Sequence, residues 1–284
     1  MISFICFIRR GFILSFLLLF FQIKLSFSNE LESENLNNIL KKIEALKLYD
    51  HPTWKTLLHY DPKSDKSYIT DKNFLLSLKE GHFSLKREMI LTIESFLNSQ
   101  NLPENANPIC KFPARLYWLK SNIPELDELI PKVECKDLND YLEKAPADNI
   151  TLVFAAEDVK NPTSMMGHVF LKLTGYNNNG LYVEHAISFF AVLDTLNPVK
   201  LIIDSTITGM DSFFSLKPYR KFISRYLIDE NRVVWEFPLK NLKDEDKKLI
   251  HLHIWELKDV KTKYYFTSYN CATVIYYLLS IAQP

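Results

Sequence analysis

Apolar positions repeat at helical spacing in the first third of the chain. Leu and Ile recur three or four residues apart between 30 and 48, with Lys and Glu on the opposite face, which predicts an amphipathic surface helix. Similar spacing predicts helices over 54–60 and 85–97. The segment 101–108, which contains two prolines and three asparagines, is the best linker candidate. We therefore predict a helical N-terminal region over residues 29–105.

The pattern changes to an extended one from residue 150 onwards. Apolar and β-branched runs bounded by turn residues predict five strands. The Asn-rich sequence before Gly180 predicts a three-residue hairpin turn between the second and third strands. Two helices follow, over 244–257 and from Cys271 to about Ala282. The predicted strands cover residues 151–156, 168–173, 182–190, 201–205 and 232–237.

These elements predict an α+β fold. Residues 106–284 are predicted to form one domain, which holds a mostly antiparallel sheet and a C-terminal helix.

The first 28 residues have the composition of an export signal. Arg9 and Arg10 precede the apolar run 12–21, and Ser26 and Ser28 occupy the −3 and −1 positions that a signal peptidase reads. The alternative is an uncleaved anchor, because the residues before Arg9 are also apolar. No later stretch is apolar for the roughly 18 residues that a membrane span needs. We predict a periplasmic or cell-envelope protein with no internal transmembrane helix.

Composition places the rest of the chain among globular proteins. Of 284 residues, 47% are hydrophobic and 24% are charged, with 34 basic and 34 acidic side chains. This balance leaves no broad basic field for a phosphate backbone, so nucleic acid is not a predicted partner. Removal of the leader takes away Arg9, Arg10 and Lys24 and leaves the mature chain faintly acidic.

Three cysteines remain after the leader, which indicates one disulfide and one free thiol in an exported protein. Cys110 and Cys135 are close enough in sequence to pair easily. In the loop-closure model such a bridge contributes roughly 3.5 kcal/mol of stability. This pairing leaves Cys271 as the free thiol.

Cys271 follows Asn270 at the start of the predicted final helix. Free amide N–H groups and the helix dipole favour a thiolate at that position, which makes the sulfur a candidate nucleophile. The alternative role is a small apolar residue that faces the core beside Ile275 and Leu278.

A thiol enzyme also needs an imidazole that takes and returns a proton. His168 stands at the start of a predicted strand, after Gly167 and a turn-prone segment that includes Ser164. Pairing the hairpin around a three-residue turn puts Ser188 opposite His168, on the same sheet face, as the group that would orient the ring. His185 is the alternative, because a one-residue change of register would exchange the two. We predict supporting roles for Asn270, Gly167 and Ser164.

The remaining histidines show no metal-binding pattern. The pair at 251 and 253 would not point both rings at one ion from a helix, and no carboxylate or cysteine cluster accompanies it. No glycine-rich phosphate loop and no nucleophile elbow occur. We predict no metal and no cofactor. The scattered histidines after the leader are His51, His59, His82, His251 and His253.

Eight ordered blocks of the sequence resemble the bacterial family named for the Lnb N-terminal periplasmic domain, and they cover nearly all of the mature chain. The blocks are Trp54–Tyr60, Cys110–Arg115 with Trp118 and Leu119, Pro162–His168, Ile207–Gly209, Phe214 and Ser215 with Pro218 and Tyr219, Trp235 and Glu236, His253–Leu257, and Tyr264–Phe266 with Asn270 and Cys271.

This resemblance implies a circularly permuted, NlpC-like papain core. Histidine precedes cysteine in it, which is the reverse of the common NlpC-type order. It implies that Cys271 is the nucleophile and His168 the base, and Ser188 stands where many relatives have Asn. The family's namesake is a lipoprotein N-acyltransferase that moves a fatty acyl chain from phospholipid through a cysteine thioester to the amino terminus of a lipoprotein. A lipid or lipoprotein is therefore the first expected substrate, without a cofactor.

Departures from the family pattern leave alternatives open. This chain has Met210, Asp211 and Ser212 where relatives often have glycines and a second Pro-Gly, and longer members continue beyond the cysteine helix. Ending at Pro284 is expected of a truncated product or of a form that needs no membrane anchoring. The alternatives are a cell-wall peptidase or amidase that acts on peptidoglycan with the same residues, and an inactive domain that binds an envelope partner.

Overall fold

The computed structural model describes residues 34–158, 167–195 and 197–282. Residues 34–46 are helical, as the apolar spacing in this region predicts. The described residues up to Leu48 belong to one compact unit, and Tyr49–Pro284 forms a second. The leader lies outside the described residues, so the signal peptide stays a prediction. The predicted domain boundary after residue 105 also stays a prediction. Within the described ranges, no helix combines the length and the apolar character needed to cross a bilayer.

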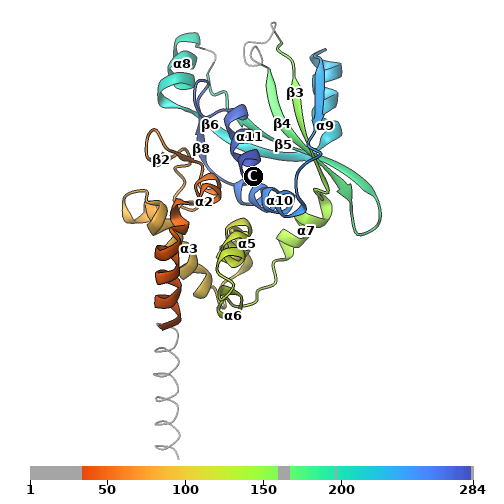
Figure 1. The fold of residues 1–284 in the computed structure, drawn as a ribbon. Helices are drawn as coiled ribbons and strands as arrows, with labels where there is room; N and C mark the ends of the chain where they lie inside the picture. Colours follow the sequence, from red (N-terminus) through yellow and green to blue (C-terminus); the bar gives the residue numbers. More distant parts are fainter. Residues whose placement is uncertain (1–33, 159–166, 196, 283–284) are drawn as a thin grey trace, which may run out of the picture. The chain divides into compact units, whose positions relative to one another are not determined.

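Along the second unit helices predominate up to residue 144, and the strands of the main sheet come after them, interspersed with further helices (Figure 1). The helices, including 3-10 and π turns, are η1 Leu48–Asp50, α2 Pro52–Leu57, η2 Leu76–Glu80, α3 Leu85–Leu97, η3 Glu104–Ala106, α4 Pro108–Lys111, α5 Pro113–Asn122, α6 Leu126–Leu129, α7 Lys136–Lys144, α8 Pro198–Ile203, η5 Asp204–Thr208, α9 Tyr219–Ser224, η6 Arg225–Asp229, α10 Asp244–Leu257 and α11 Cys271–Ser280. The strands are β1 Tyr60–Asp61, β2 Lys66–Ser67, β3 Asn149–Ala155, β4 His168–Tyr176, β5 Tyr182–Ala191, β6 Met210–Pro218, β7 Val234–Pro238 and β8 Thr262–Tyr264.

Six of these strands form one antiparallel sheet in the order β7-β3-β4-β5-β6-β8. Side chains alternate between its faces, so Phe170 and Ala186 share one face, which α9 and η6 cover through Phe222 and Tyr226. Helix α11 packs against β4 and β5. On the other face, Phe189 stacks on the ring of Tyr264 at 5.3 Å. The mixed helix and sheet confirm the predicted α+β class.

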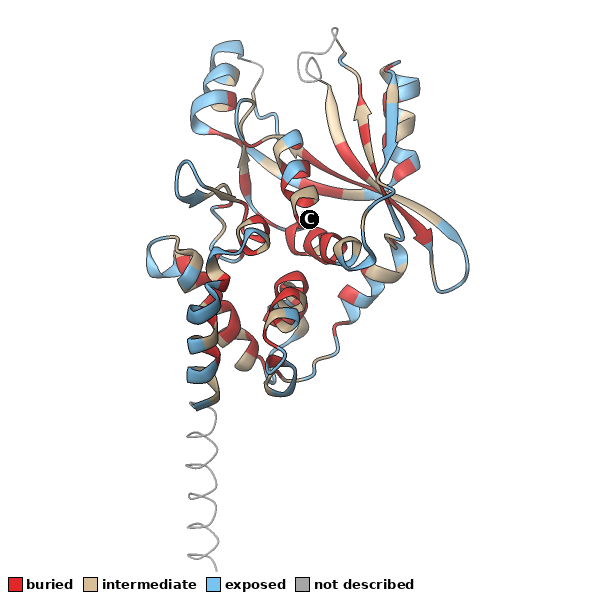
Figure 2. Cartoon of the chain, in the orientation of Figure 1, coloured by how far each residue is buried: buried red, intermediate tan, exposed pale blue. Residues whose placement is uncertain are grey.

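Figure 2 shows the buried residues of the sheet and of α10 and α11. Helix α3 begins where predicted, because the Ser84 hydroxyl accepts a hydrogen bond from the Arg87 amide and caps it. Helix α10 also has the predicted bounds.

The predicted strand 201–205 is wrong. These residues belong to α8 and to the π turn that follows it. Asn197 caps the helix by accepting from the amides of Val199 and Lys200, and Pro198 stands at its first position. An Asn-Pro pair is a helix start signal, and here it outweighs the β-branched residues that follow. Strands β6 and β8 were not predicted.

The hairpin register also differs from the prediction. Tyr176 pairs with Tyr182 and Leu171 with Ile187, so the loop spans residues 177–181 instead of three residues. Ser188 is therefore two positions away from lying directly opposite His168. Because a shift of two residues preserves the sheet face, Ser188 still lies on the face of His168, and His185 lies on the other.

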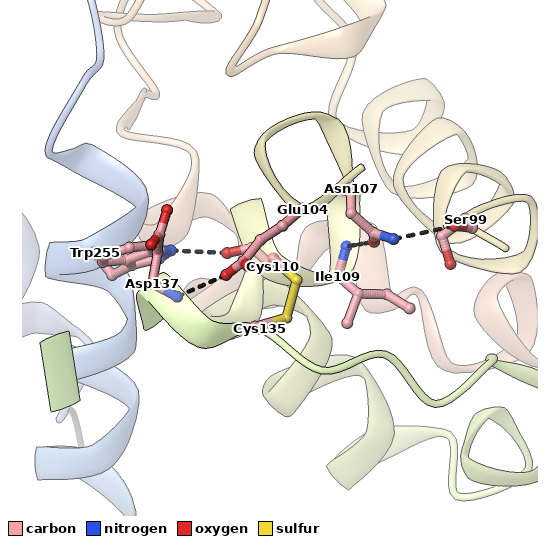
Figure 3. The surroundings of a disulfide bond; sticks show 8 residues. All are labelled: Ser99, Glu104, Asn107, Ile109, Cys110, Cys135, Asp137 and Trp255. Atoms are coloured by element: carbon pink, nitrogen blue, oxygen red, sulfur yellow. Dashed lines mark hydrogen bonds between the residues drawn. A yellow bond between two sulfur atoms is a disulfide. The ribbon is translucent and has the colours of Figure 1, made fainter. Parts of the chain in front are cut away.

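The predicted disulfide between Cys110 and Cys135 is confirmed, with 5.4 Å between the two Cα atoms (Figure 3). It joins α4 to the residue that precedes α7. The Trp255 indole of α10 donates to the Cys110 carbonyl at 2.7 Å, which ties the disulfide to the helix that packs against α5 and α11.

Candidate active site

Cys271 is the first residue of α11, and it is the free cysteine of the described region. The Asn270 side chain caps the helix by accepting from the Thr273 amide at 3.1 Å, and its own amide donates to the Phe266 carbonyl. Cys271 is 9% exposed. The sulfur therefore lies at the positive end of a helix dipole, in the position that the sequence predicted.

The Tyr264 hydroxyl is the polar neighbour of the sulfur. It donates to Cys271 Sγ at 3.6 Å, and the Cys271 amide donates to the Tyr264 oxygen at 3.4 Å. Burial raises the pKa of Tyr264, and negative charge at Cys271 raises it further. The hydroxyl therefore stays protonated at neutral pH and can donate. Sequence reasoning included Tyr264 only within a family block and assigned it no role.

His168 begins β4, and its ring is stacked on Phe190 with 4.8 Å between centroids. Its Nε2 is hydrogen-bonded to the Ser188 hydroxyl. Burial lowers the pKa of His168 to about 3, and the positive charges of Arg232 and Arg225 contribute. The ring is therefore neutral at physiological pH, which is the form that can accept a proton.

One cavity of about 630 Å³ is lined by both Cys271 and His168. It lies where β4 begins and β5 ends, with Gly167 and Ala191 among its lining residues. The two side chains reach it from different sides of the sheet, since His168 shares the face of Phe170. In the described part of the chain no hydrogen bond links the thiol to the imidazole. The structure thus brings both groups to one cavity without direct contact.

Tyr226 also lines this cavity and was missed by sequence reasoning. Its ring centroid is 6.3 Å from that of His168. Burial raises the pKa of Tyr226 to about 12, and charge at Cys271 is among the smaller causes. The apolar and basic pattern of 219–229 contains no signal that marks this tyrosine, because its place depends on how η6 packs over the sheet.

The sequence model of the family described as Lnb N-terminal periplasmic domain matches residues 137–284, more than half of the 284-residue chain. The chain belongs to this family. A second family, described as a domain of unknown function (DUF7843), matches residues 46–122. No curated protein and no solved structure matches the chain. The periplasmic description agrees with the envelope location that the sequence predicts.

Within the Lnb N-terminal periplasmic domain, the contacts distinguish the two candidates for orienting His168. Ser188 is buried and hydrogen-bonded to the ring. His185 lies on the opposite face, and its Nδ1 is buried without a hydrogen-bond partner in the described chain. Gly167 has φ +75°, and a Cβ at this position would lie too close to the Phe154 ring, so the position favours glycine. Ser164 lies outside the described residues, so its supporting role stays a prediction.

We expect His168 to make this domain sensitive to acid. Its folded pKa lies below the roughly 6.5 of an unfolded histidine, so the unfolded chain binds the proton first as pH falls. Stability is fully present above about pH 6.5 and is lost towards about pH 3, at up to about 1.4 kcal/mol per pH unit. Urea unfolding at about pH 7 and about pH 5 should show a smaller loss for His168→Gln than for the wild type.

The matched control is His82→Gln, which replaces an exposed histidine. It should lose as much stability as the wild type over the same interval. Equal losses for His168→Gln and the wild type would contradict the buried neutral imidazole.

Proposed function

We propose that this chain is an envelope acyltransferase that carries the acyl group of a lipid as a thioester on Cys271. The observation that supports the proposal is the shared cavity, in which a thiol at a helix N-terminus, a half-buried hydroxyl donor and a neutral imidazole all line one space. A permuted papain-like core and the roles of Cys271, His168 and Ser188 remain part of the proposal.

In the first step, Cys271 Sγ attacks the carbonyl carbon of a lipid ester. A C–S bond forms, the C–O bond to the glycerol breaks, and His168 takes the thiol proton and returns it to the leaving oxygen. An acceptor amine then attacks the thioester, so that a C–N bond forms and the C–S bond breaks, with the amine proton passing to the sulfur. His168 would exchange Ser188 for the thiol when substrate binds, since catalytic hydrogen bonds often tighten only in the complex.

The carbonyl oxygen gains negative charge in each step. The Cys271 amide and the Tyr264 hydroxyl would both donate to it, because their present mutual contact of 3.4 Å leaves each close to the sulfur. Hydrogen bonds from both groups to the substrate carbonyl oxygen would then replace the weak contact between the two groups.

The lining of the cavity supports a lipid as the substrate class. Aromatic and aliphatic side chains such as Phe190, Leu193 and Phe213 form much of it, which suits an acyl chain. Lys217 and Lys221 also line it, and neither has a carboxylate partner among the described residues. Unpaired lysines beside an apolar wall favour an amphiphile with a phosphate headgroup.

The experiment that tests the proposal follows lysophospholipid released from phosphatidylethanolamine vesicles by the full chain, with a peptide amine as acceptor. Lysophospholipid and acylated peptide should accumulate together. Cleavage of peptidoglycan stem peptides without lipid turnover would contradict the proposal and support a cell-wall peptidase or amidase instead. If the chain turns over neither substrate, the outcome contradicts the proposal and supports an inactive envelope-binding domain.

We expect the double variant Lys217→Ala/Lys221→Ala to bind phospholipid less well. Its KM should rise by about tenfold while kcat changes less than about twofold, because a headgroup contact is made equally in the ground state and the transition state. Vesicle assays over a range of lipid concentrations give both constants. The control is Arg220→Ala, an exposed base of α9 that does not line the cavity. A similar rise in KM for the control would contradict a specific headgroup contact.

An inactive envelope-binding domain is the second candidate. One observation favours it: the sulfur and the imidazole each have a different partner, the Tyr264 and Ser188 hydroxyls. In that case the cavity would hold a ligand without reacting with it.

A further inference from the structure

A chain of fully buried polar side chains runs from the segment matched by DUF7843 to the loop that carries Cys271. Tyr269 Oη is 2.7 Å from His59 Nδ1, and His59 Nε2 is 3.1 Å from His253 Nε2. His253 Nδ1 is in turn 2.9 Å from Glu256 Oε2. None of these side chains takes part in the chemistry proposed above. His59, His253 and Tyr269 are 0% exposed.

The Glu256 carboxylate fixes the direction of the hydrogen bond at one end of this chain. Its other oxygen accepts from the amides of Ala114 and Arg115, at 2.8 and 3.0 Å. His253 Nδ1 therefore donates to Glu256, and in the form of His253 whose Nε2 carries no proton that atom accepts from His59 Nε2. His59 Nδ1 is left as an acceptor, so the Tyr269 hydroxyl donates to it.

His59 is neutral in this arrangement, which agrees with its surroundings. Burial lowers the pKa of His59 well below its ordinary value, and the nearby charges of His253 and Arg115 lower it further. A neutral ring with one donor and one acceptor nitrogen is what the chain requires.

The backbone at His59 indicates that this side chain is needed. His59 has φ +49° and is the second residue after the end of α2, where glycine or asparagine is usual. A left-handed conformation costs a histidine free energy that glycine would not lose. Its ring is also fixed by stacking on Tyr277, with 4.7 Å between centroids.

Tyr269 transmits this fixed geometry to the thiol. It stands two residues before Cys271, and its carbonyl accepts from the Tyr265 amide at 2.9 Å, which closes the loop. Its ring stacks on Tyr68 at 4.9 Å and lies edge-on to Phe189, which lines the cavity. Holding the Tyr269 hydroxyl therefore holds the turn that sets the start of α11.

We propose that His59 is a positioning residue for Cys271, and that the DUF7843 segment serves the active site through the chain Glu256–His253–His59–Tyr269. This inference rests on the proposed function for its catalytic consequence. Its structural consequence, a loop ordered from the N-terminal segment, can be measured without any activity.

The test compares variants of the full chain that break or keep the hydrogen-bonded chain. Tyr269→Phe removes the hydroxyl, and His59→Leu removes both ring nitrogens. His59→Gln keeps an acceptor and a donor. The matched control is Tyr277→Phe, which removes the hydroxyl that donates to the Tyr60 carbonyl at 2.7 Å but leaves the chain intact.

Two readouts are followed in each variant: amide hydrogen exchange of peptides that cover 265–273, and the rate of lysophospholipid release. Tyr269→Phe and His59→Leu should exchange faster in this loop and turn over lipid at least about tenfold more slowly, since small misplacements of a reacting group cost that much. His59→Gln should recover most of both readouts, and Tyr277→Phe should behave as the wild type.

The outcomes separate this inference from the proposed function. Unchanged loop exchange in Tyr269→Phe overturns the inference, even if His59→Leu fails to fold. Equal slowing by Tyr277→Phe also overturns it, because the effect would then be general to α11. If the wild type releases no lysophospholipid, the proposed function fails, while the exchange data still decide whether His59 orders the loop.

Discussion

Cys271→Ala is expected to lower the rate of lysophospholipid release by at least about a thousandfold, because the proposed mechanism forms its covalent intermediate on this thiol. Tyr264 and His168 would remain in the cavity, but neither can carry the acyl group in the proposed steps. The rate is measured on vesicles by mass spectrometry of the lipid products.

The substitution is small, and Cys271 makes weak polar contacts with Tyr264 at 3.4 and 3.6 Å. The variant should therefore keep its fold, which a thermal unfolding curve checks. Ser215→Ala is the control, since it shortens another cavity-lining side chain of similar size. A rate within about tenfold of the wild type for Cys271→Ala would contradict nucleophilic catalysis by the thiol.

Arg115→Leu is expected to destabilise the protein by about 3–5 kcal/mol, because it leaves buried carboxylates without their cation. Arg115 Nη1 is 3.0 Å from Glu88, and its Nε is 3.9 Å from Glu256. All three side chains are 0% exposed. The guanidinium also lies 4.3 Å from the ring centres of Phe74 and Phe112. Urea unfolding gives the free energy directly.

Arg87→Leu is the matched control, because Arg87 has a similar ion pair with Glu80 at 2.6 Å on the exposed surface. Solvent screens that pair, so its loss should cost only a small fraction of the loss for Arg115→Leu. Comparable unfolding free energies for the two variants would show that the buried charges do not hold the DUF7843 segment to the rest of the unit.

Local signals predicted the elements whose ends are set by their own residues. Ser84 caps helix α3 and Asn270 caps helix α11, and both helices were predicted from the sequence. Residues 201–205, predicted as a strand, are instead helical and π-helical, because Asn197 and Pro198 start a helix just before them. Strand β6 was missed because buried and exposed residues do not alternate regularly along it.

The site was predictable in its chemistry and less so in its geometry. Alternation along strands put Ser188 on the face of His168 even though the register was wrong by two residues. No sequence pattern indicated that His59 and His253, 194 positions apart, would be hydrogen-bonded. Isolated histidines carry no periodic signal, and only tertiary packing brings them together.

The central claim is that Cys271 carries the acyl group, and the mass of the peptide that contains it tests this most directly. The full chain is incubated with phosphatidylethanolamine vesicles in the absence of an acceptor, quenched in acid, digested and analysed by mass spectrometry. We predict a Cys271 peptide heavier by one fatty acyl group, which neutral hydroxylamine removes because the bond is a thioester. An unmodified Cys271 peptide in a sample that has produced lysophospholipid would contradict the account.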